Sequence, residues 1–163
     1  MISFDSFSTA DTEGIGNMLA HALLKSGVRR AYLALRGEMG VGKTAFTRGF
    51  AAGVGTSGVR SPTYTVVCEY RGGALPIFHF DLYRLEDEDD LYGIGYDDYL
   101  SQDGFILCEW TERIPSAVPS DAITVTIART EKDDCARRVS VIFPPSLSHI
   151  TLKERTTHDP SCH

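Results

Sequence analysis

One glycine-rich segment reads Gly37-Glu38-Met39-Gly40-Val41-Gly42-Lys43-Thr44, which matches the phosphate-loop pattern G-x-x-x-x-G-K-[ST]. In such a loop the glycines let successive backbone N–H groups point inward at phosphate oxygens. Lys43 would reach the outer phosphates as a point charge, and the Thr44 hydroxyl would bind the magnesium ion that accompanies them. The pattern predicts a nucleoside triphosphate site, and the alternative is an ordinary glycine turn beside a surface lysine.

The segments on both sides of this loop have the order that a phosphate loop needs, with a strand before it and a helix after it. Residues 31–35 form a short apolar run, which is typical of a buried parallel strand. Residues 44–52 carry Phe46 and Phe50 at helical spacing, and Gly53 follows as a stop signal. The context therefore favours nucleotide binding over the ordinary turn.

The remaining chain adds a helix and several strands to this unit. We expect a helix over about 11–26, capped by Ser8 or Thr9 and ended by Gly27. Strand patterns occur at 64–70, 76–81, 105–108, 122–128 and 138–143. We predict an α/β fold of the P-loop NTPase type, with a mixed, mostly parallel sheet flanked by helices and an antiparallel C-terminal strand pair. The acidic run 86–90 suits either the first turn of a helix or a solvated face.

Chain length and charge limit the possible partners. At 163 residues the chain is long enough for one core and short for two, so we predict a single domain over 1–163. Residues from about 144 onward are polar and rich in proline and serine, and we expect the last ten to be disordered. The net charge of −6 argues against a domain that grips nucleic acid unaided, although a partner would be able to present it.

The sequence also indicates the compartment. No stretch approaches the roughly 20 apolar residues that a membrane span needs, and Asp5 stands where a signal peptide needs positive charge. The four cysteines are widely separated and form no C-x-x-C pair, so neither a zinc site nor a disulfide framework is indicated. We therefore expect a cytoplasmic protein without membrane contact.

Two carboxylates are candidates for a metal site. Asp81 ends the apolar run 77–81, and Glu109 follows the apolar run 105–108. In an open α/β sheet, ligands bind beyond the carboxyl ends of the strands, so both acids and the phosphate loop would meet in one crevice. The alternative for Asp81 is an aspartate that caps a turn at the end of its strand.

Four segments together carry a family resemblance: Gly37–Thr44, Ser61-Pro62-Thr63-Tyr64, His79-Phe80-Asp81-Leu82-Tyr83-Arg84 and Glu109-Trp110. In order and spacing the chain resembles the TsaE (formerly YjeE) family over roughly residues 8–143. The resemblance implies a small bacterial ATPase of tRNA threonylcarbamoyladenosine biosynthesis that uses ATP and Mg²⁺. It also implies two partner proteins that carry the threonylcarbamoyl-transfer machinery, bind the tRNA and modify its adenosine 37, so that this chain meets tRNA only indirectly.

The resemblance implies roles for matching positions. Lys43 would bind phosphates, and Thr44, Asp81 and Glu109 would hold the magnesium ion. Thr63 would belong to a switch-like element near the γ-phosphate. Lys43, Asp81, Glu109 and Thr63 are thus the expected catalytic residues.

The nucleotide-binding residues that the resemblance implies are Thr12, Gly37, Glu38, Met39, Gly40, Val41, Gly42, Lys43 and Thr44. Thr12 falls where the family approaches the adenine, and a helix-cap role is its alternative. Glu38 and Met39 replace the more usual Asp and Leu of the family loop. No family feature assigns a contact to Arg137 or Arg138.

Three further residues have two readings each. His79 is either a proton acceptor or a strand histidine satisfied by its neighbours. Arg84 is either an internal arginine finger or the partner of the acidic run in a surface ion pair. Trp110 either covers the nucleotide or is buried at a strand end.

Four functions are compatible with the motifs to different degrees. We favour an ATPase that is slow alone, because no residue is an obvious base for the attacking water. A non-catalytic ATP-dependent switch stays open. A regulatory GTPase is disfavoured because Asn17 is the only asparagine, which excludes the N-K-x-D guanine motif. A small-molecule kinase would need a lid and an acceptor pocket, and neither is evident.

Overall fold

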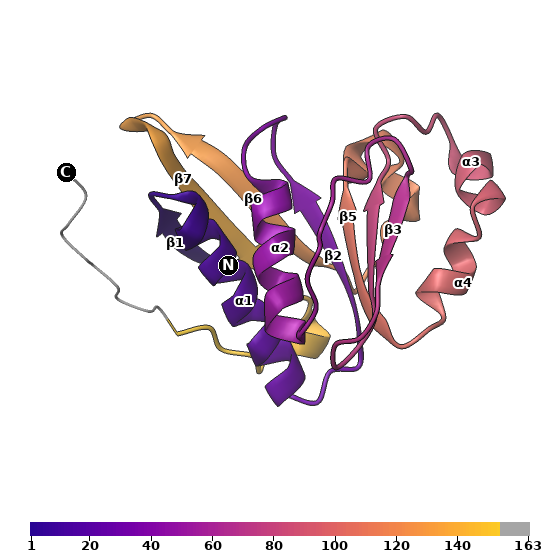
Figure 1. Ribbon diagram of the computed structural model, residues 1–163, viewed down its shortest axis with the longest axis horizontal. Helices are drawn as coiled ribbons and strands as arrows, with labels where there is room; N and C mark the ends of the chain where they lie inside the picture. The colour runs from indigo at the N-terminus through magenta and orange to yellow at the C-terminus, as the bar shows by residue number, and fades with distance from the viewer. Residues whose placement is uncertain (154–163) are drawn as a thin grey trace.

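The computed structural model describes residues 1–153 as one seven-stranded sheet with helices packed against it (Figure 1). The strands are β1 (Ile2–Ser6), β2 (Arg30–Arg36), β3 (Val67–Tyr70), β4 (Ile77–Asp81), β5 (Gly104–Glu109), β6 (Ile123–Thr130) and β7 (Asp133–Ile142). The α-helices are α1 (Thr9–Lys25), α2 (Lys43–Val54), α3 (Glu88–Gly93) and α4 (Tyr96–Leu100). Three 3₁₀ turns follow β5 and β7: η1 (Thr111–Arg113), η2 (Pro115–Ala117) and η3 (Pro145–Leu147).

The strands lie in the order β1-β7-β6-β2-β5-β4-β3. β2 is parallel to both β5 and β6, and β4 is parallel to β5. The β3–β4, β6–β7 and β1–β7 pairs are antiparallel. The predicted mixed sheet, with a parallel centre and an antiparallel C-terminal strand pair, is confirmed.

The helices α1 and α2 lie side by side against one face of the sheet (Figure 1). Glycine makes their close approach possible: a Cβ atom on Gly49 of α2 would overlap the Glu13 carbonyl oxygen of α1, and one on Gly16 would overlap the Phe46 carbonyl oxygen. The α1 helix begins where the Ser8 hydroxyl accepts a hydrogen bond from the Asp11 backbone N–H at 3.1 Å. Of the two predicted caps, Ser8 is therefore the correct one.

Two cores lie on opposite faces of the sheet because successive side chains of a strand point to opposite faces. On β5, Phe105 and Leu107 belong to the core beneath α1 and α2, which also contains Phe46 and Phe50. Ile106 and Cys108 belong to the second core, together with Phe78, Phe80, Leu91 and Tyr96. The central strands are thus buried on both faces, as the continuous apolar runs predict.

The structure differs from the sequence prediction at β3. Only Val67–Tyr70 pairs as a strand, whereas 64–70 was expected. The preceding residues form a turn, in which the Val66 N–H donates to the Pro62 carbonyl oxygen at 2.7 Å and Val66 adopts a left-handed φ of 67°. A β-branched residue rarely adopts this conformation, and nothing in the apolar pattern signals it.

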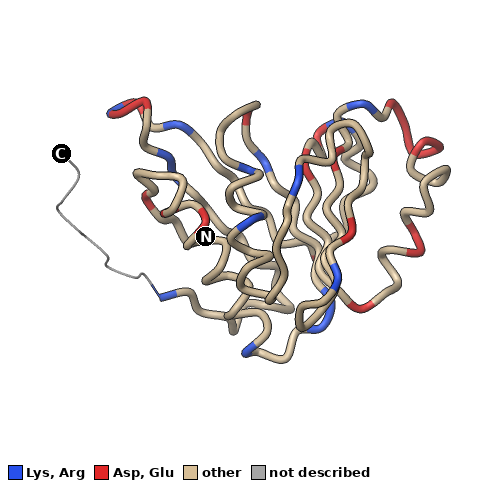
Figure 2. The backbone as a smooth tube through the Cα atoms, viewed as in Figure 1, with Lys and Arg blue, Asp and Glu red and all other residues tan. Residues whose placement is uncertain are grey.

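One strand and one α-helix were not predicted. β1 pairs antiparallel with β7, placing Phe4 opposite Val139 in the first core, and α4 is too short to show helical periodicity. The acidic run 86–90 contributes to the start of a helix and also forms a solvated face, so both interpretations of it apply. The Asp87 carboxylate caps α3 by accepting from the Asp90 N–H at 3.1 Å, and the acids are exposed, forming the red segment at α3 in Figure 2.

The segment after β7 contributes to the first core where a polar tail was expected. Ile150 is 4% exposed, and Leu147 and Leu152 pack against the same core. The expected disorder of the last ten residues falls on 154–163, which lie outside the described residues. Within residues 1–153, no helix is long and apolar enough to cross a membrane.

Candidate nucleotide-binding site

The glycine-rich loop connects the end of β2 to the start of α2. Gly40 and Gly42 have φ values of 74° and 122°, a region that favours glycine over other residues. A Cβ atom on Gly37 would lie 2.5 Å from the Ile127 carbonyl oxygen, so only glycine fits against β6 there. Gly42 caps α2 without a side-chain hydrogen bond. The first backbone N–H groups of α2 are therefore available to an anion.

Lys43 is held inside this loop. Its side chain is buried, and its Nζ atom donates to the Gly37 carbonyl oxygen at 2.7 Å. The same ammonium lies 4.1 Å from the ring centroid of Trp110, a favourable cation–π contact. No salt bridge joins Lys43 to a carboxylate within residues 1–153, so its charge is uncompensated at the centre of the loop.

The two candidate carboxylates lie opposite each other at the ends of neighbouring strands. Asp81 of β4 pairs in parallel register with Glu109 of β5, which in turn pairs with Leu35 of β2. Asp81 and Glu109 are 4% and 5% exposed. Three adjacent parallel strands thus bring Asp81, Glu109 and the phosphate loop to the same edge of the sheet, as expected for ligand sites of open α/β sheets.

The loop that contains Thr63 is attached to Asp81. The Thr63 hydroxyl donates to Asp81 Oδ2 at 3.0 Å, and the Tyr83 N–H donates to Oδ1 at 2.9 Å. The left-handed Val66 ends the same loop, and its carbonyl oxygen accepts from the Asp81 N–H at 2.9 Å. Because backbone outliers persist only where the surroundings enforce them, this loop has a defined position next to the carboxylate.

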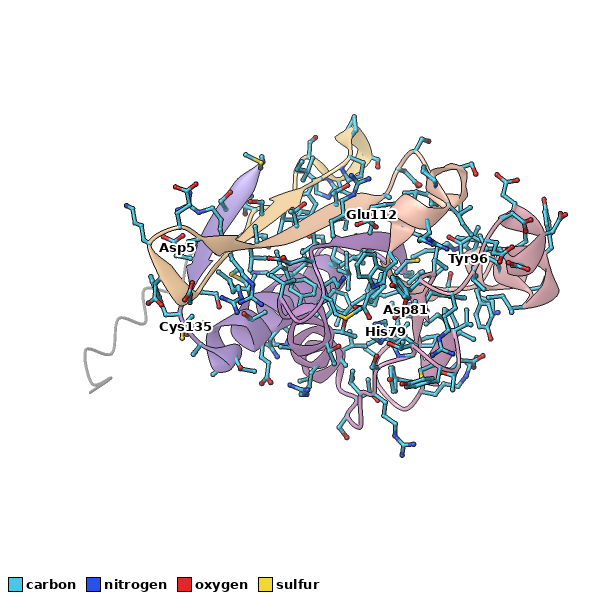
Figure 3. The ribbon with its side chains drawn as sticks, turned by 90° about the horizontal axis from the view of Figure 1, so that it is seen from above. Asp5, His79, Asp81, Tyr96, Glu112 and Cys135 are labelled. Atoms are coloured by element: carbon cyan, nitrogen blue, oxygen red, sulfur yellow. The ribbon has the colours of Figure 1, made fainter. Side chains whose placement is uncertain are left out.

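Glu109 has a different partner. The His79 Nε2 atom lies 2.8 Å from Glu109 Oε2, and His79 is completely buried. Figure 3 labels His79 and Asp81, whose side chains lie close together on β4, the strand next to the edge strand β3. The His79 Nδ1 atom has no hydrogen-bond partner among the described residues. His79 is therefore only half satisfied by its neighbours, and its one bond is to a candidate metal ligand.

The other predicted nucleotide-binding residues differ in their placement. Thr12 is buried next to Gly42, and its hydroxyl shares a 2.7 Å hydrogen bond with Ser6. Thr44 is partly exposed at the start of α2. Glu38 forms an exposed 3.2 Å ion pair with Arg129, and Met39 is 69% exposed. Thr12 and Thr44 adjoin the loop, whereas the Glu38 and Met39 side chains lie at its surface.

Sequence reasoning assigned no role to Arg137, yet the structure brings it to the loop. Its Nε donates to the Val41 carbonyl oxygen at 3.1 Å, whereas Arg138 pairs with Asp5 on the other side of β7. The predicted strand 138–143 begins one residue too late to include Arg137, whereas strand alternation over the observed β7 places Arg137 and Arg138 on opposite faces. Arg84 lies 4.5 Å from the Tyr64 ring centroid, and no salt bridge within residues 1–153 joins it to the acidic run.

Trp110 follows β5 in a left-handed conformation, with φ of 59°. Its ring lies 5.0 Å from that of Tyr83, and it is half-buried. Together with the Lys43 contact, this places the indole at the edge of the phosphate loop.

The donor set is suited to a magnesium ion that arrives with a nucleotide. Within residues 1–153, no group of three or more His, Cys, Asp and Glu residues forms a metal site. Mg²⁺ in nucleotide sites is held through one or two carboxylates, and phosphates and water complete its shell. Asp81, Glu109 and the Thr44 hydroxyl would supply the protein ligands of such a magnesium ion, whose shell phosphates and water complete.

The chain is similar to known proteins in both sequence and structure. The family model described as threonylcarbamoyl adenosine biosynthesis protein TsaE matches residues 6–139. The chain is 38% identical over 128 residues to the tRNA threonylcarbamoyladenosine biosynthesis protein TsaE of Bacillus subtilis (strain 168), covering 78% of each chain. It is 40% identical over 134 residues to the protein of the same name from Haemophilus influenzae, covering 81% of this chain and 83% of that one.

A solved structure supports the same relationship. The crystal structure of Bacillus subtilis YdiB superposes with a TM-score of 0.71 at 29% identity, covering 89% of this chain and 86% of that chain. The family match spans most of the phosphate-loop fold described above. The chain belongs to the TsaE family, which takes part in the biosynthesis of threonylcarbamoyladenosine in tRNA.

Proposed function

We propose that this protein binds ATP with Mg²⁺ and hydrolyses it slowly in support of threonylcarbamoyl modification of tRNA adenosine 37. The main support is one geometric observation: β2, β5 and β4 are adjacent and parallel, and they end in the phosphate loop, Glu109 and Asp81, respectively. Phosphoryl transfer depends chiefly on positioning and on stabilising negative charge. This edge supplies backbone N–H groups, an ammonium and two carboxylates for those tasks.

Each residue has a defined task in this proposal. The N–H groups of the loop and of the first turn of α2 bind phosphate oxygens, and Lys43 neutralises the outer phosphates. Thr44, Asp81 and Glu109 hold the magnesium ion, which supplies charge stabilisation on the γ-phosphate when bound. On nucleotide binding, the Lys43 ammonium exchanges the Gly37 carbonyl oxygen for phosphate.

The proposed dependence of ATP hydrolysis on partner proteins follows from the lack of a base for the attacking water among the described residues of this site. The two carboxylates that end β4 and β5 at this edge are Asp81 and Glu109. Both Asp81 oxygens accept hydrogen bonds, from Thr63 and from the Tyr83 backbone. In this proposal Asp81 and Glu109 both hold the metal ion, so neither serves as the base for the attacking water, and turnover of the isolated protein should be slow. The two-protein threonylcarbamoyl-transfer complex would complete the site in the cytoplasm and would bind the tRNA, consistent with the acidic net charge of −6.

The test is phosphate release from ATP by the protein alone, by the partner pair alone and by the assembled complex. We expect slow release by the protein alone and faster release from the complex. Fast hydrolysis by the isolated protein would contradict partner gating. Asp81→Asn should retain much of the nucleotide binding but depress hydrolysis, whereas full activity would remove Asp81 from the metal site.

Two controls separate the competing functions. Competition between ATP and GTP for the site distinguishes an ATPase from a regulatory GTPase. Single-turnover hydrolysis in the assembled complex distinguishes an ATPase from a switch module, because a switch would bind ATP without cleaving it. Binding without any cleavage in the complex would replace the ATPase proposal with the switch.

A further inference from the structure

We propose that His79 is the positioning residue for Glu109, holding one carboxylate oxygen so that the other is directed at the nucleotide-bound metal. This inference rests on the proposed function, because it assigns Glu109 to the metal. It adds a residue outside the metal-ligand set, and it explains a buried polar side chain that phosphate binding leaves without a role.

The register of the sheet places His79 beside Glu109. β4 and β5 are parallel, with His79 opposite Leu107 and Asp81 opposite Glu109. His79 and Asp81 are two residues apart, so both side chains leave β4 on the same face. On that face His79 Nε2 reaches across to Glu109 Oε2 at 2.8 Å. The bond links a residue inside the core to one at the ligand edge of the sheet.

The partner of His79 fixes the position of one ring hydrogen. A carboxylate only accepts hydrogen bonds, so the shared hydrogen belongs to His79 Nε2. The Nδ1 atom is buried without a hydrogen-bond partner among the described residues. A buried unpaired polar atom is unfavourable, and an apolar residue would avoid it. Among residues 1–153 the bond to Glu109 is the one hydrogen bond of the ring, and it offsets part of this cost.

The two carboxylates are consequently fixed in different ways. Asp81 accepts hydrogen bonds on both oxygens, from Thr63 and from the Tyr83 N–H. Glu109 accepts on Oε2 alone among its described side-chain bonds. The imidazole is completely buried, so surrounding atoms restrict its rotation. It therefore determines the direction in which the free Oε1 atom of Glu109 points, as outer partners do for metal-binding carboxylates.

The test replaces His79 with two amides that differ in reach. The Gln side-chain nitrogen falls near the Nε2 position of His, whereas the Asn nitrogen falls near Nδ1 and is too short to reach Glu109. We would measure Mn²⁺ affinity by electron paramagnetic resonance in the presence of a nonhydrolysable ATP analogue. Loss of an outer-shell partner typically weakens metal affinity roughly 10–100-fold. We expect that loss for His79→Asn and near-normal affinity for His79→Gln.

Controls separate positioning from general destabilisation. Tyr32→Phe removes a buried hydrogen bond on the opposite face of the sheet and should leave Mn²⁺ affinity unchanged. Glu109→Gln gives the loss of Mn²⁺ affinity that is expected when the proposed metal ligand itself is removed. If both His79 variants bind Mn²⁺ equally, whether weakly or normally, the positioning role is wrong.

A measurement on the unmodified protein avoids any dependence on variant folding. Nitrogen-15 NMR of His79 should show a hydrogen on Nε2, and an Nε2 atom without a hydrogen would overturn the inference. The same measurements distinguish a failure of the proposed function from a failure of the positioning role of His79. If the unmodified protein does not bind Mn²⁺ with the ATP analogue, the proposed function is wrong and the inference falls with it. If Glu109→Gln weakens Mn²⁺ binding but His79→Asn does not, only the inference is wrong.

Discussion

Two buried polar clusters lie back to back on β5, one on each face of the sheet. Cys108 faces the second core with Tyr32 and Tyr96, whereas the next residue, Glu109, faces the phosphate loop with His79. In the first cluster the Tyr96 hydroxyl donates to the Tyr32 oxygen at 2.7 Å and lies 3.1 Å from the Ala117 carbonyl oxygen. That cluster consists of uncharged groups that satisfy one another.

The cluster around Glu109 differs in its charges and in its unfilled bonds. Within residues 1–153 it contains two carboxylates, the Lys43 ammonium held by a backbone carbonyl and a ring, and a half-bonded histidine. Buried charges are costly unless they are paired or bind a ligand. Burial of polar groups alone thus does not mark a site on this protein. The site is instead marked by charged groups that lack an internal partner and lie at the carboxyl ends of parallel strands.

The largest expected effect comes from Lys43, the uncompensated charge of the site. Lys43→Ala should lower ATP hydrolysis by the assembled complex roughly 10²–10³-fold, the loss typical of removing one transition-state donor, and should abolish productive ATP binding. The control is Arg48→Ala, which removes a cation of the same helix that pairs with Glu13 at the surface. Unchanged nucleotide affinity in Lys43→Ala, measured by calorimetry, would defeat the phosphate-loop assignment and with it the contrast between the two clusters.

The second prediction concerns the helices that cover only the nucleotide-site face. Gly49→Ala forces a methyl group into the Glu13 backbone, and overpacking of this kind costs about 3 kcal/mol of unfolding free energy. Gly14→Ala on the exposed side of α1 meets nothing within 4 Å and should stabilise by roughly 0.5–1 kcal/mol. Chemical denaturation measures both. Equal effects of the two substitutions would show that the contact between α1 and α2 is not tight.

The third prediction tests the uncharged cluster through its response to alkali. Burial raises the pKa of the Cys108 thiol from 9.0 to about 12, and burial also raises the pKa of Tyr32 well above its usual value. A group whose pKa is raised on folding stabilises the protein below its unfolded pKa and loses that contribution as pH rises. Stability should therefore fall between pH 9 and about 12, by up to about 1.4 kcal/mol per pH unit for each group.

Cys108→Ala isolates the thiol in that experiment, because it removes one titrating group while leaving both tyrosines. Denaturation at several pH values should give a shallower loss of stability above pH 9 for this variant than for the unmodified protein. Identical slopes would mean that the thiol is not protected by burial, and the view of this cluster as a closed structural unit would need revision.

The local elements of the site were predictable because each has a short-range signal. The strand, loop and helix around Lys43 follow from an apolar run, spaced glycines and helical periodicity. Asp81 and Glu109 were identified as strand-end acids from their own apolar runs. The left-handed turn at Val66 was not predictable, because it depends on hydrogen bonds with Pro62 and Asp81 rather than on residue type.

The sequence by itself determined the phosphate loop, the candidate ligands and the mixed sheet, because these depend on residue types at fixed spacing along one segment. Only the tertiary structure decided that His79 bonds Glu109, that Arg137 rather than Arg138 reaches the loop, and that Ile150 joins the core. Each of these is a contact between segments far apart in the chain. Such contacts depend on strand register and on which face a residue occupies, and a shift of one residue would reverse them.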